Sequence, residues 1–298
     1  MRPATVEEAS AFLADASRDG RRARIGADLL TGGLDRVLEH EAGDLTCTVE
    51  GGIRLSALQA TLAEAGQRLS LDPPGDPTIG ACLAGRLSGP LSHRYGTPRD
   101  LVLGVTLVLG DGTVASSGGK VVKNVAGYDL GKLVCGSQGR LGLIARVSLR
   151  LHPLPAATGT LVVETDDAAG VVRTLRRSQL APSALDVLHP GRVAVLFEGA
   201  EAAVEAQLHA ATALVGGHRA EPAVWEESRE RQAAALGRLR FDPGDLPNTL
   251  STVREAVVRP AAGVAYVPDR VGGVPSPTAR RLDHALRERF DPAGVLGS

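Results

Sequence analysis

Residues that could hold a phosphorylated ligand are concentrated between Asp72 and Pro155. The segment Asp72–Pro77 is expected to be a rigid loop, because its three prolines fix φ and remove backbone hydrogen-bond donors. Thr78 follows at the position of a helix N-cap, and small apolar residues continue to Leu87. Because the start of a helix presents free N–H groups, this junction is a natural seat for a phosphate.

Glycines recur through the rest of this region, where they would let the backbone approach a large, flat ligand closely. Any one of them is more simply a turn residue, and Gly110–Gly112 is fully explained as the turn of a hairpin. The glycines form neither the G-x-G-x-x-G pattern of a Rossmann site nor the G-x-x-x-x-G-K-[ST] pattern of a P-loop. A nucleotide site here would therefore be of another kind.

Lysine is almost absent from the chain, yet its three lysines, Lys120, Lys123 and Lys132, fall in one short stretch. A compact point charge, which arginine does not supply, is one reason for such clustering. Chance clustering on a solvated surface is the alternative.

Charge and motif content exclude several other classes of function. With 33 basic and 34 acidic residues, the net charge of −1 offers no basic field for nucleic acid. The three cysteines lack C-x-x-C spacing and no H-E-x-x-H occurs, so we predict no metal site. The first 16 residues do not read as a secretory signal, and no apolar run is long enough to span a bilayer. The expected location is the cytoplasm, with any contact to the inner face of the membrane made through partners.

The length of 298 residues suits two domains, and the break at Pro153–Pro155 suggests residues 1–155 and 156–298. The second part shows a βαββα order typical of a split βαβ, hence an α+β domain of ferredoxin-like type. We predict strands at Leu45–Glu50, Leu101–Leu109, Leu141–Leu151, Leu161–Glu164, Ala184–Leu188, Val193–Glu198 and Gly263–Val267. We predict helices at Val6–Arg18, Leu55–Leu69, Tyr128–Cys135, Asp166–Arg177, Glu201–Val215, Trp225–Leu239 (facing solvent) and Thr278–Phe290.

The amino-acid sequences of four segments resemble those of one known family. These segments are Leu87–Pro90, Arg99–Val105, Lys123–Leu130 and Gly136–Gly142. From about Leu45 to Pro155 the chain is similar to the FAD-binding domain of the vanillyl-alcohol-oxidase and p-cresol-methylhydroxylase type. Within that type it most closely resembles the FAD-binding E subunit of bacterial glycolate oxidase. Phe290–Val295 resembles the C-terminal sequence motif of the same subunit, so the similarity covers nearly the whole chain.

The resemblance implies a two-subdomain FAD-binding domain followed by a smaller α+β cap, with FAD bound non-covalently. The residues implied to line the diphosphate and ribose are Thr78, Ile79, Gly80 and Leu83, and Gly26 and Pro74 are also expected to bind the cofactor. Those implied to lie toward the flavin are Ser88, Gly89, Tyr95 and Asp100, while Gly136, Gly139, Gly142 and Ile144 return along the cofactor. Lys123, Asn124, Tyr128 and Asp129 are assigned either to the ligand or to a subunit contact.

The first phosphate loop departs from the family pattern, which is an Arg, a run of glycines and a Thr or Ser. Here Arg24–Leu30 keeps one glycine and adds Asp28, whose charge would repel a diphosphate. Further on, Ala81 and Arg86 stand where the family has glycines. These departures leave open a structural subunit that has weakened or lost FAD binding.

The resemblance implies a subunit of a glycolate-oxidase-like complex that oxidises a 2-hydroxy acid, either glycolate or D-lactate. A second flavin subunit and an iron–sulfur subunit are the implied partners. No catalytic constellation stands out, and His93 is either a functional group or, more simply, a loop residue. A stand-alone FAD-dependent oxidoreductase is the remaining alternative.

Overall fold

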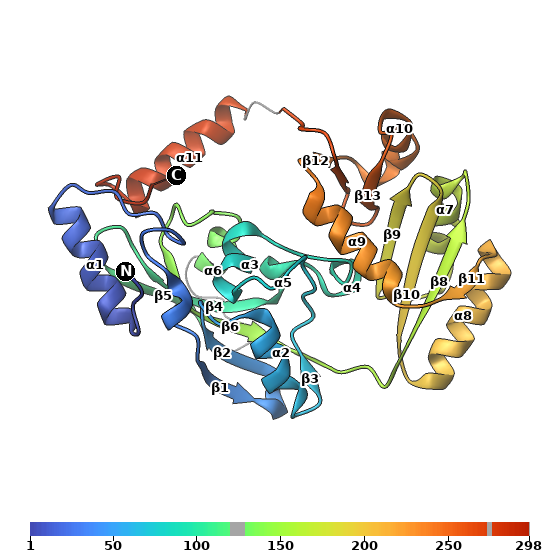
Figure 1. Cartoon of the computed structure of the whole chain (residues 1–298), viewed down its shortest axis with the longest axis horizontal. Coiled ribbons are helices and arrows are strands. Elements are labelled where there is room, and N and C mark those ends of the chain that lie inside the picture. The colour runs from blue at the N-terminus through green and yellow to red at the C-terminus, as the bar shows by residue number, and fades with distance from the viewer. Residues whose placement is uncertain (120–128, 273–275, 298) are drawn as a thin grey trace.

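The computed structural model describes residues 1–119, 129–272 and 276–297. The chain forms two lobes, each built on its own antiparallel sheet (Figure 1). The two sheets lie side by side in the molecule rather than stacking on one another. The expected α+β class is confirmed.

The first lobe contains a five-stranded sheet in the order β1-β2-β6-β4-β5. These strands are β1 Val37–Glu41, β2 Thr46–Glu50, β6 Leu143–Arg150, β4 Val102–Val108 and β5 Val114–Gly118. Helices α2 (Leu55–Ala63) and α3 (Ile79–Gly85) bury Leu58, Leu62 and Leu83 in a core shared with the sheet. Helix α1 (Val6–Arg18) packs in a separate cluster that includes Leu143 and Ala145 of β6.

Short elements accompany this sheet, and one of them, α4 (Ser92–Tyr95), contacts β9 (Ala184–His189) of the second lobe. The others are β3 Gln67–Arg68, α5 Pro98–Leu101, α6 Leu130–Val134 and β7 His152–Pro153. Strands β3 and β7 pair with each other as a separate two-stranded sheet.

The second lobe contains a seven-stranded sheet in the order β11-β8-β10-β9-β13-β14-β12. Its strands are β8 Ala157–Glu164, β9 Ala184–His189, β10 Arg192–Gly199, β11 His218–Ala220, β12 Gly237–Arg240, β13 Ala256–Arg259 and β14 Val264–Val267. With α7 (Ala168–Arg177) and α8 (Glu201–Val215), the strands β11-β8-β10-β9 have the order and antiparallel pairing of a ferredoxin-like unit. The expected ferredoxin-like arrangement is therefore present, and β13, β14 and β12 extend it.

Helices cover both faces of the second sheet. Helices α7, α8 and α10 (Leu246–Thr252) bury one apolar face of it. On the other face, α9 (Ala223–Ala234) packs Val224 and Trp225 against the strands. The Trp225 indole N–H donates to Thr160 Oγ1 at 3.0 Å.

Two expected helices differ from the observed elements. The helix predicted to reach Leu69 ends at Ala63, because Gly66 turns the chain at φ +66° and β3 follows. The helix predicted over Trp225–Leu239 ends at Ala234, and β12 begins three residues later. Its expected exposure to solvent is wrong in part, because the Arg and Glu residues hide a buried stripe that includes Trp225.

The C-terminal segment returns to the first lobe (Figure 1). After α11 (Pro277–Phe290), the Asp291 carboxylate accepts hydrogen bonds from the N–H groups of Val295 and Leu296, each at 2.8 Å. Both apolar side chains are buried in the same cluster as α1. The division at residue 155 stays a prediction, and the last residues pack with the first lobe rather than the second.

A buried ion pair joins the two lobes. Arg68 of β3 donates two hydrogen bonds to Glu198 of β10, at 2.8 and 2.7 Å, and Tyr95 Oη donates to the same carboxylate at 3.0 Å. The side chains of Arg68 and Glu198 are only 14% and 4% exposed. Burial opposes ionisation of Glu198, but Arg68 outweighs it and lowers the pKa of the carboxyl.

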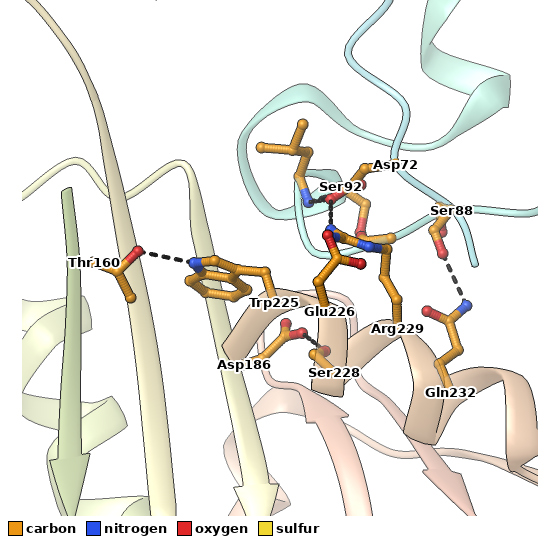
Figure 2. A network of polar contacts seen from close by, with 12 residues as sticks. Asp72, Ser88, Ser92, Thr160, Asp186, Trp225, Glu226, Ser228, Arg229 and Gln232 are labelled. Atoms are coloured by element: carbon orange, nitrogen blue, oxygen red, sulfur yellow. Dashed lines mark hydrogen bonds and ion pairs between the residues drawn. The ribbon is translucent and has the colours of Figure 1, made fainter. Parts of the chain in front are cut away.

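A second polar network lies where α9 meets the loops of the first lobe (Figure 2). The Asp72 carboxylate accepts from the Leu91 N–H at 3.1 Å and lies 3.7 Å from the Arg229 guanidinium. Gln232 Nε2 donates to the Ser88 carbonyl at 2.9 Å. Behind these contacts, Ser228 Oγ donates to the fully buried Asp186 at 2.6 Å. Contacts from α9 therefore fix the second lobe against residues 72–91.

We expect Glu198→Gln to lower the free energy of unfolding by about 3 kcal/mol, because removing one partner leaves the other charge buried and unpaired. Urea denaturation measures the loss. The matched control is Glu205→Gln, which breaks an exposed ion pair to Arg219. The Arg219 side chain is 61% exposed and that of Glu205 is 52% exposed. That control should change stability by about 1 kcal/mol or less. Equal losses in the two variants would contradict a special role for the buried pair.

Burial raises the pKa of Asp72 to about 7, against the lowering effects of Arg259, the Leu91 N–H and Arg229. An unfolded Asp titrates near 4, so the folded chain holds this proton more tightly between about pH 4 and pH 7. The Asp72 contribution to stability is therefore present below about pH 4 and is lost as the pH rises to about 7.

We expect Asp72→Asn to flatten the decline of the unfolding free energy between about pH 4 and pH 7. The asparagine Oδ1 can still accept from Leu91 without an ionisation step. Asp166→Asn, at an exposed carboxyl outside the network, is the control and should keep the wild-type slope. Urea titrations at several pH values measure both, and an unchanged slope in Asp72→Asn would refute the assignment.

Candidate functional site: a glycine-lined cavity in the first lobe

A cavity of about 520 Å³ opens between the loop Arg24–Leu30 (the first loop), α3 and the segment 138–142 that precedes β6. Its lining residues are Ile25, Gly26, Thr31, Arg54, Pro77, Thr78, Gly80, Ala81, Ala84, Gly85, Gln138, Gly139, Gly142, Leu143 and Ile144. A second cavity of about 490 Å³ shares Gly26, Thr31, Arg54 and Thr78 with it. The two cavities therefore meet along one wall.

The backbone that forms one side of this cavity requires glycine at two points. Gly139 has φ +77°, and a Cβ there would lie 3.4 Å from the Cβ of Ile25, across the cavity wall. Gly142 has φ +143°, and a Cβ there would lie 2.9 Å from the Val108 carbonyl oxygen. These conformations disfavour other residues, so the wall is shaped by the backbone itself.

The first loop is closed by its own contacts. Asp28 Oδ2 accepts from the Arg24 backbone N–H at 2.9 Å and from the Arg24 Nε at 3.2 Å. The N–H groups of Gly26 and Leu29 are bonded inside the loop, to Leu29 and Arg24 carbonyls. The carboxylate that the sequence placed beside a diphosphate is therefore neutralised by Arg24.

The backbone N–H groups at the start of α3 are also hydrogen-bonded within the protein. Thr78 is the N-cap, as predicted, and its Oγ1 accepts from the Ala81 N–H at 3.2 Å. The N–H groups of Ile79 and Gly80 donate to the Ile53 and Gly51 carbonyls at 2.9 and 2.6 Å. The helix start therefore offers an anion fewer free donors than its sequence suggested.

Six of the predicted site residues line this cavity: Gly26, Thr78, Gly80, Gly139, Gly142 and Ile144. Ile79 and Leu83 are fully buried in the core beneath it. Gly136 is adjacent to α3 rather than in the lining, since its N–H donates to the Leu83 carbonyl at 2.9 Å. Pro74 is half-buried in the predicted rigid loop.

Of the residues expected on the flavin side, Ser88 and Tyr95 contact the second lobe, while Gly89 and Asp100 have contacts within the first. The Ser88 carbonyl accepts from Gln232, and Tyr95 bonds Glu198. Gly89 packs so closely on the Asp72 carbonyl that a Cβ would lie 1.8 Å from its oxygen. Asp100 caps its own helix by accepting from the Thr97 N–H at 2.7 Å. The described contacts of these four residues are therefore structural.

Part of the strongest sequence motif, with Lys123, Asn124 and Tyr128, lies outside the described residues. Its described end shows Asp129 as the N-cap of α6, with an ion pair to Lys132 at 2.9 Å.

Sequence reasoning missed the other nine lining residues, which are Ile25, Thr31, Arg54, Pro77, Ala81, Ala84, Gly85, Gln138 and Leu143. Arg54 is the most informative, because it lines both cavities and its Nη1 donates to the Asp76 carbonyl at 2.6 Å. Its position two residues after the Gly51–Gly52 turn is the signal that could have located it.

The lining fits a long ligand with flat rings and a diphosphate. Ala81, Ala84 and Leu143 give an apolar wall, and the glycines keep side chains out of the space. Arg54, where the cavities join, and Arg2, in the second cavity, supply positive charge for phosphates. FAD has this combination of parts, so the residues present fit it.

No histidine lines either cavity among the described residues. His93 lies between the lobes instead, where burial lowers its pKa and Asp186 opposes the shift. In the described ranges, no three His, Cys, Asp or Glu side chains gather as metal ligands. Over the same ranges, no helix has the length and apolar character to cross a bilayer.

Comparison with known proteins finds a family match within the first lobe. A family model described as an FAD binding domain matches residues 1–118. Glycolate oxidase subunit GlcE of Escherichia coli is 33% identical over 201 residues, which cover 66% of this chain and 56% of that protein. Mitochondrial D-lactate dehydrogenase [cytochrome] 1 of Saccharomyces cerevisiae is 32% identical over 158 residues, covering 52% of this chain and 27% of that protein. The chain thus spans less than two thirds of either relative.

The fold has a solved counterpart in alkyldihydroxyacetonephosphate synthase, with a TM-score of 0.75 at 16% identity, over 99% of this chain and 75% of that one. The expected fold is thereby confirmed. Residues 1–118 match an FAD-binding domain, in a chain similar to glycolate oxidase subunit GlcE, and the FAD cofactor expected from the sequence is confirmed.

Proposed function

We propose that this chain is the FAD-binding subunit of a glycolate-oxidase-like complex that oxidises a 2-hydroxy acid, either glycolate or D-lactate, and passes electrons to a partner. The observation that carries the proposal is the glycine-lined cavity inside a lobe that matches an FAD-binding domain. The names of the relatives, a glycolate oxidase subunit and a D-lactate dehydrogenase, supply the substrate class.

The residues proposed to hold FAD are those that shape the cavity. The backbone at Gly26, Gly139 and Gly142 admits the cofactor closely, and Arg54 faces its phosphates. When bound, the flavin accepts the electrons that the 2-hydroxy acid loses, while the protein contributes orientation, charge and exclusion of water.

A subunit role is favoured over a stand-alone oxidase by the character of the cavity walls. In their described parts the cavities carry arginines and one carboxylate, Asp35, but no histidine that could take the hydroxyl proton. A second flavin subunit and an iron–sulfur subunit would supply the missing steps, and through them a cytoplasmic chain would reach the membrane.

The first test is flavin binding by Gly139→Val, read from flavin absorption after reconstitution with FAD. The added side chain occupies the cavity wall beside Ile25, so we expect FAD to bind at least about tenfold more weakly. Gly216→Val is a matched control, because Gly216 has a similar φ of +73° but ends α8 in open space. Both variants should lose about 1 kcal/mol of stability, and only the first should lose flavin.

Two results would refute the flavin role of this cavity. One is a wild-type chain that takes up no FAD on reconstitution. The other is equal FAD affinity in wild type and Gly139→Val. Isolation from the native host, followed by identification of co-purifying flavin and iron–sulfur subunits, tests the assembly separately.

The second candidate function is a structural subunit that has lost FAD, and the closed first loop is the observation that favours it. The double variant Ala27→Gly with Asp28→Gly decides between the two. Because Arg24 already neutralises Asp28, we expect the FAD dissociation constant to change by less than about threefold. A gain of an order of magnitude or more would instead identify a damaged phosphate loop.

A further inference from the structure

Three arginines share one face of the second sheet. Arg238 of β12 pairs with Tyr266 of β14, while Arg240 of β12 and Arg259 of β13 both pair with Val264. Because paired residues and alternate residues share a face, all three guanidinium groups lie on the side of Tyr266. The guanidinium carbons of Arg238 and Arg259 lie 5.8 and 5.0 Å from the centre of the Tyr266 ring.

Only one of these arginines has a counter-ion. Arg259 is buried, lies 3.6 Å from Asp186 and donates to Gln232 Oε1 at 2.6 Å. Arg238 and Arg240 are exposed, and within the described part of the chain neither forms an ion pair or a hydrogen bond through its side chain. Among the described residues, these two cations on this face therefore lack an anionic partner.

Arg86 adds a fourth cation from the first lobe. It ends α3 with φ +51° and ψ +45°, a left-handed conformation that favours glycine. Its Nε is buried without a hydrogen-bond partner among the described residues. An arginine held in a conformation that suits glycine is the kind of outlier from which a functional hypothesis follows.

The arginines of the two lobes are close to one another. Arg86 is two residues from Ser88, whose carbonyl accepts from Arg259 Nη1 at 3.3 Å. Although Arg238 is solvent-accessible, the protein around it partly desolvates its guanidinium and lowers its pKa. Tyr266 opposes this shift, and the cations Arg240, Arg86 and Arg259 lower the pKa further. Like charges gathered in this way are stabilised when an anion lies among them.

We propose that Arg86, Arg238 and Arg240 form a binding site for the carboxylate of a small organic acid, at the seam between the two lobes. Planar guanidinium groups match the two oxygens of a carboxylate. Arg86 directly follows Gly85, which lines the proposed FAD cavity, so an acid bound here lies beside the cofactor site. The identification of the acid as a 2-hydroxy acid rests on the proposed function.

The competing explanation is that Arg238 and Arg240 protect β12, which is the edge strand of its sheet, from pairing with other chains. That explanation leaves Arg86 unexplained, because Arg86 ends a helix of the other lobe. It also predicts that substitution of Arg238 has no effect on acid binding.

The test is calorimetric titration of the full chain, reconstituted with FAD, with glycolate and with D-lactate. We expect Arg86→Gly and Arg238→Gln each to weaken binding about tenfold or more, the loss typical of one charged hydrogen-bonding partner. Arg219→Gln, an exposed arginine of the second lobe, should bind as wild type does. Arg86→Gly relieves the left-handed strain, so its melting temperature should equal or exceed that of wild type and misfolding would not explain its loss.

Each other outcome overturns the proposal. Failure of wild type to bind either acid overturns it, as does unchanged binding in Arg86→Gly and Arg238→Gln. Inorganic phosphate that competes at equal affinity overturns the assignment to carboxylates. Flavin absorption of the same samples separates the two proposals: a chain that holds FAD but binds no acid refutes only this site. A chain without FAD refutes the proposed function, while acid binding is still measured.

Discussion

The buried ion pair between Arg68 and Glu198 is the interaction on which the arrangement of the two lobes depends. Each residue belongs to a different sheet, and neither charge could stay buried if the other moved away. Tyr95 satisfies a further lone pair of the carboxylate and stacks against His152 with ring centres 4.6 Å apart. Because the pair requires two-point geometry, it fixes the orientation of the lobes as well as their distance.

This constraint decides where a ligand can lie. The polar contacts at Asp72, Ser88 and Tyr95 occupy the seam, so the large open space is inside the first lobe, between the first loop and α3. At the contact between the lobes, the part near Tyr266 is rich in arginine and is the part that could bind a charged ligand. In that part, a cofactor in the first lobe could meet charged groups from the second.

Local sequence patterns predicted most of the fold because local physics determines those elements. The hairpin of β4 and β5, the N-cap at Thr78 and the order of β8 to α8 all follow from alternation, turn residues and helical spacing. The edge strand β1, the interior strand β13 and the buried side of α9 were not predictable in this way. Trp225 is buried because Thr160, 65 residues away, accepts its N–H, and no local window contains that contact.

The candidate site likewise has features that local sequence predicts and features that it does not. Glycines with positive φ, such as Gly139, are visible in a sequence because few other residues fit them, and they do line the cavity. The destination of a backbone N–H is not visible, and at Ile79 and Gly80 the donors expected to face a phosphate are bonded to residues 51–53. Positive charge near the phosphates must therefore come from side chains, and Arg54, where the two cavities meet, is placed to provide it. Recognition of the cofactor in this chain then depends on cavity shape and arginine charge more than on a helix N-terminus.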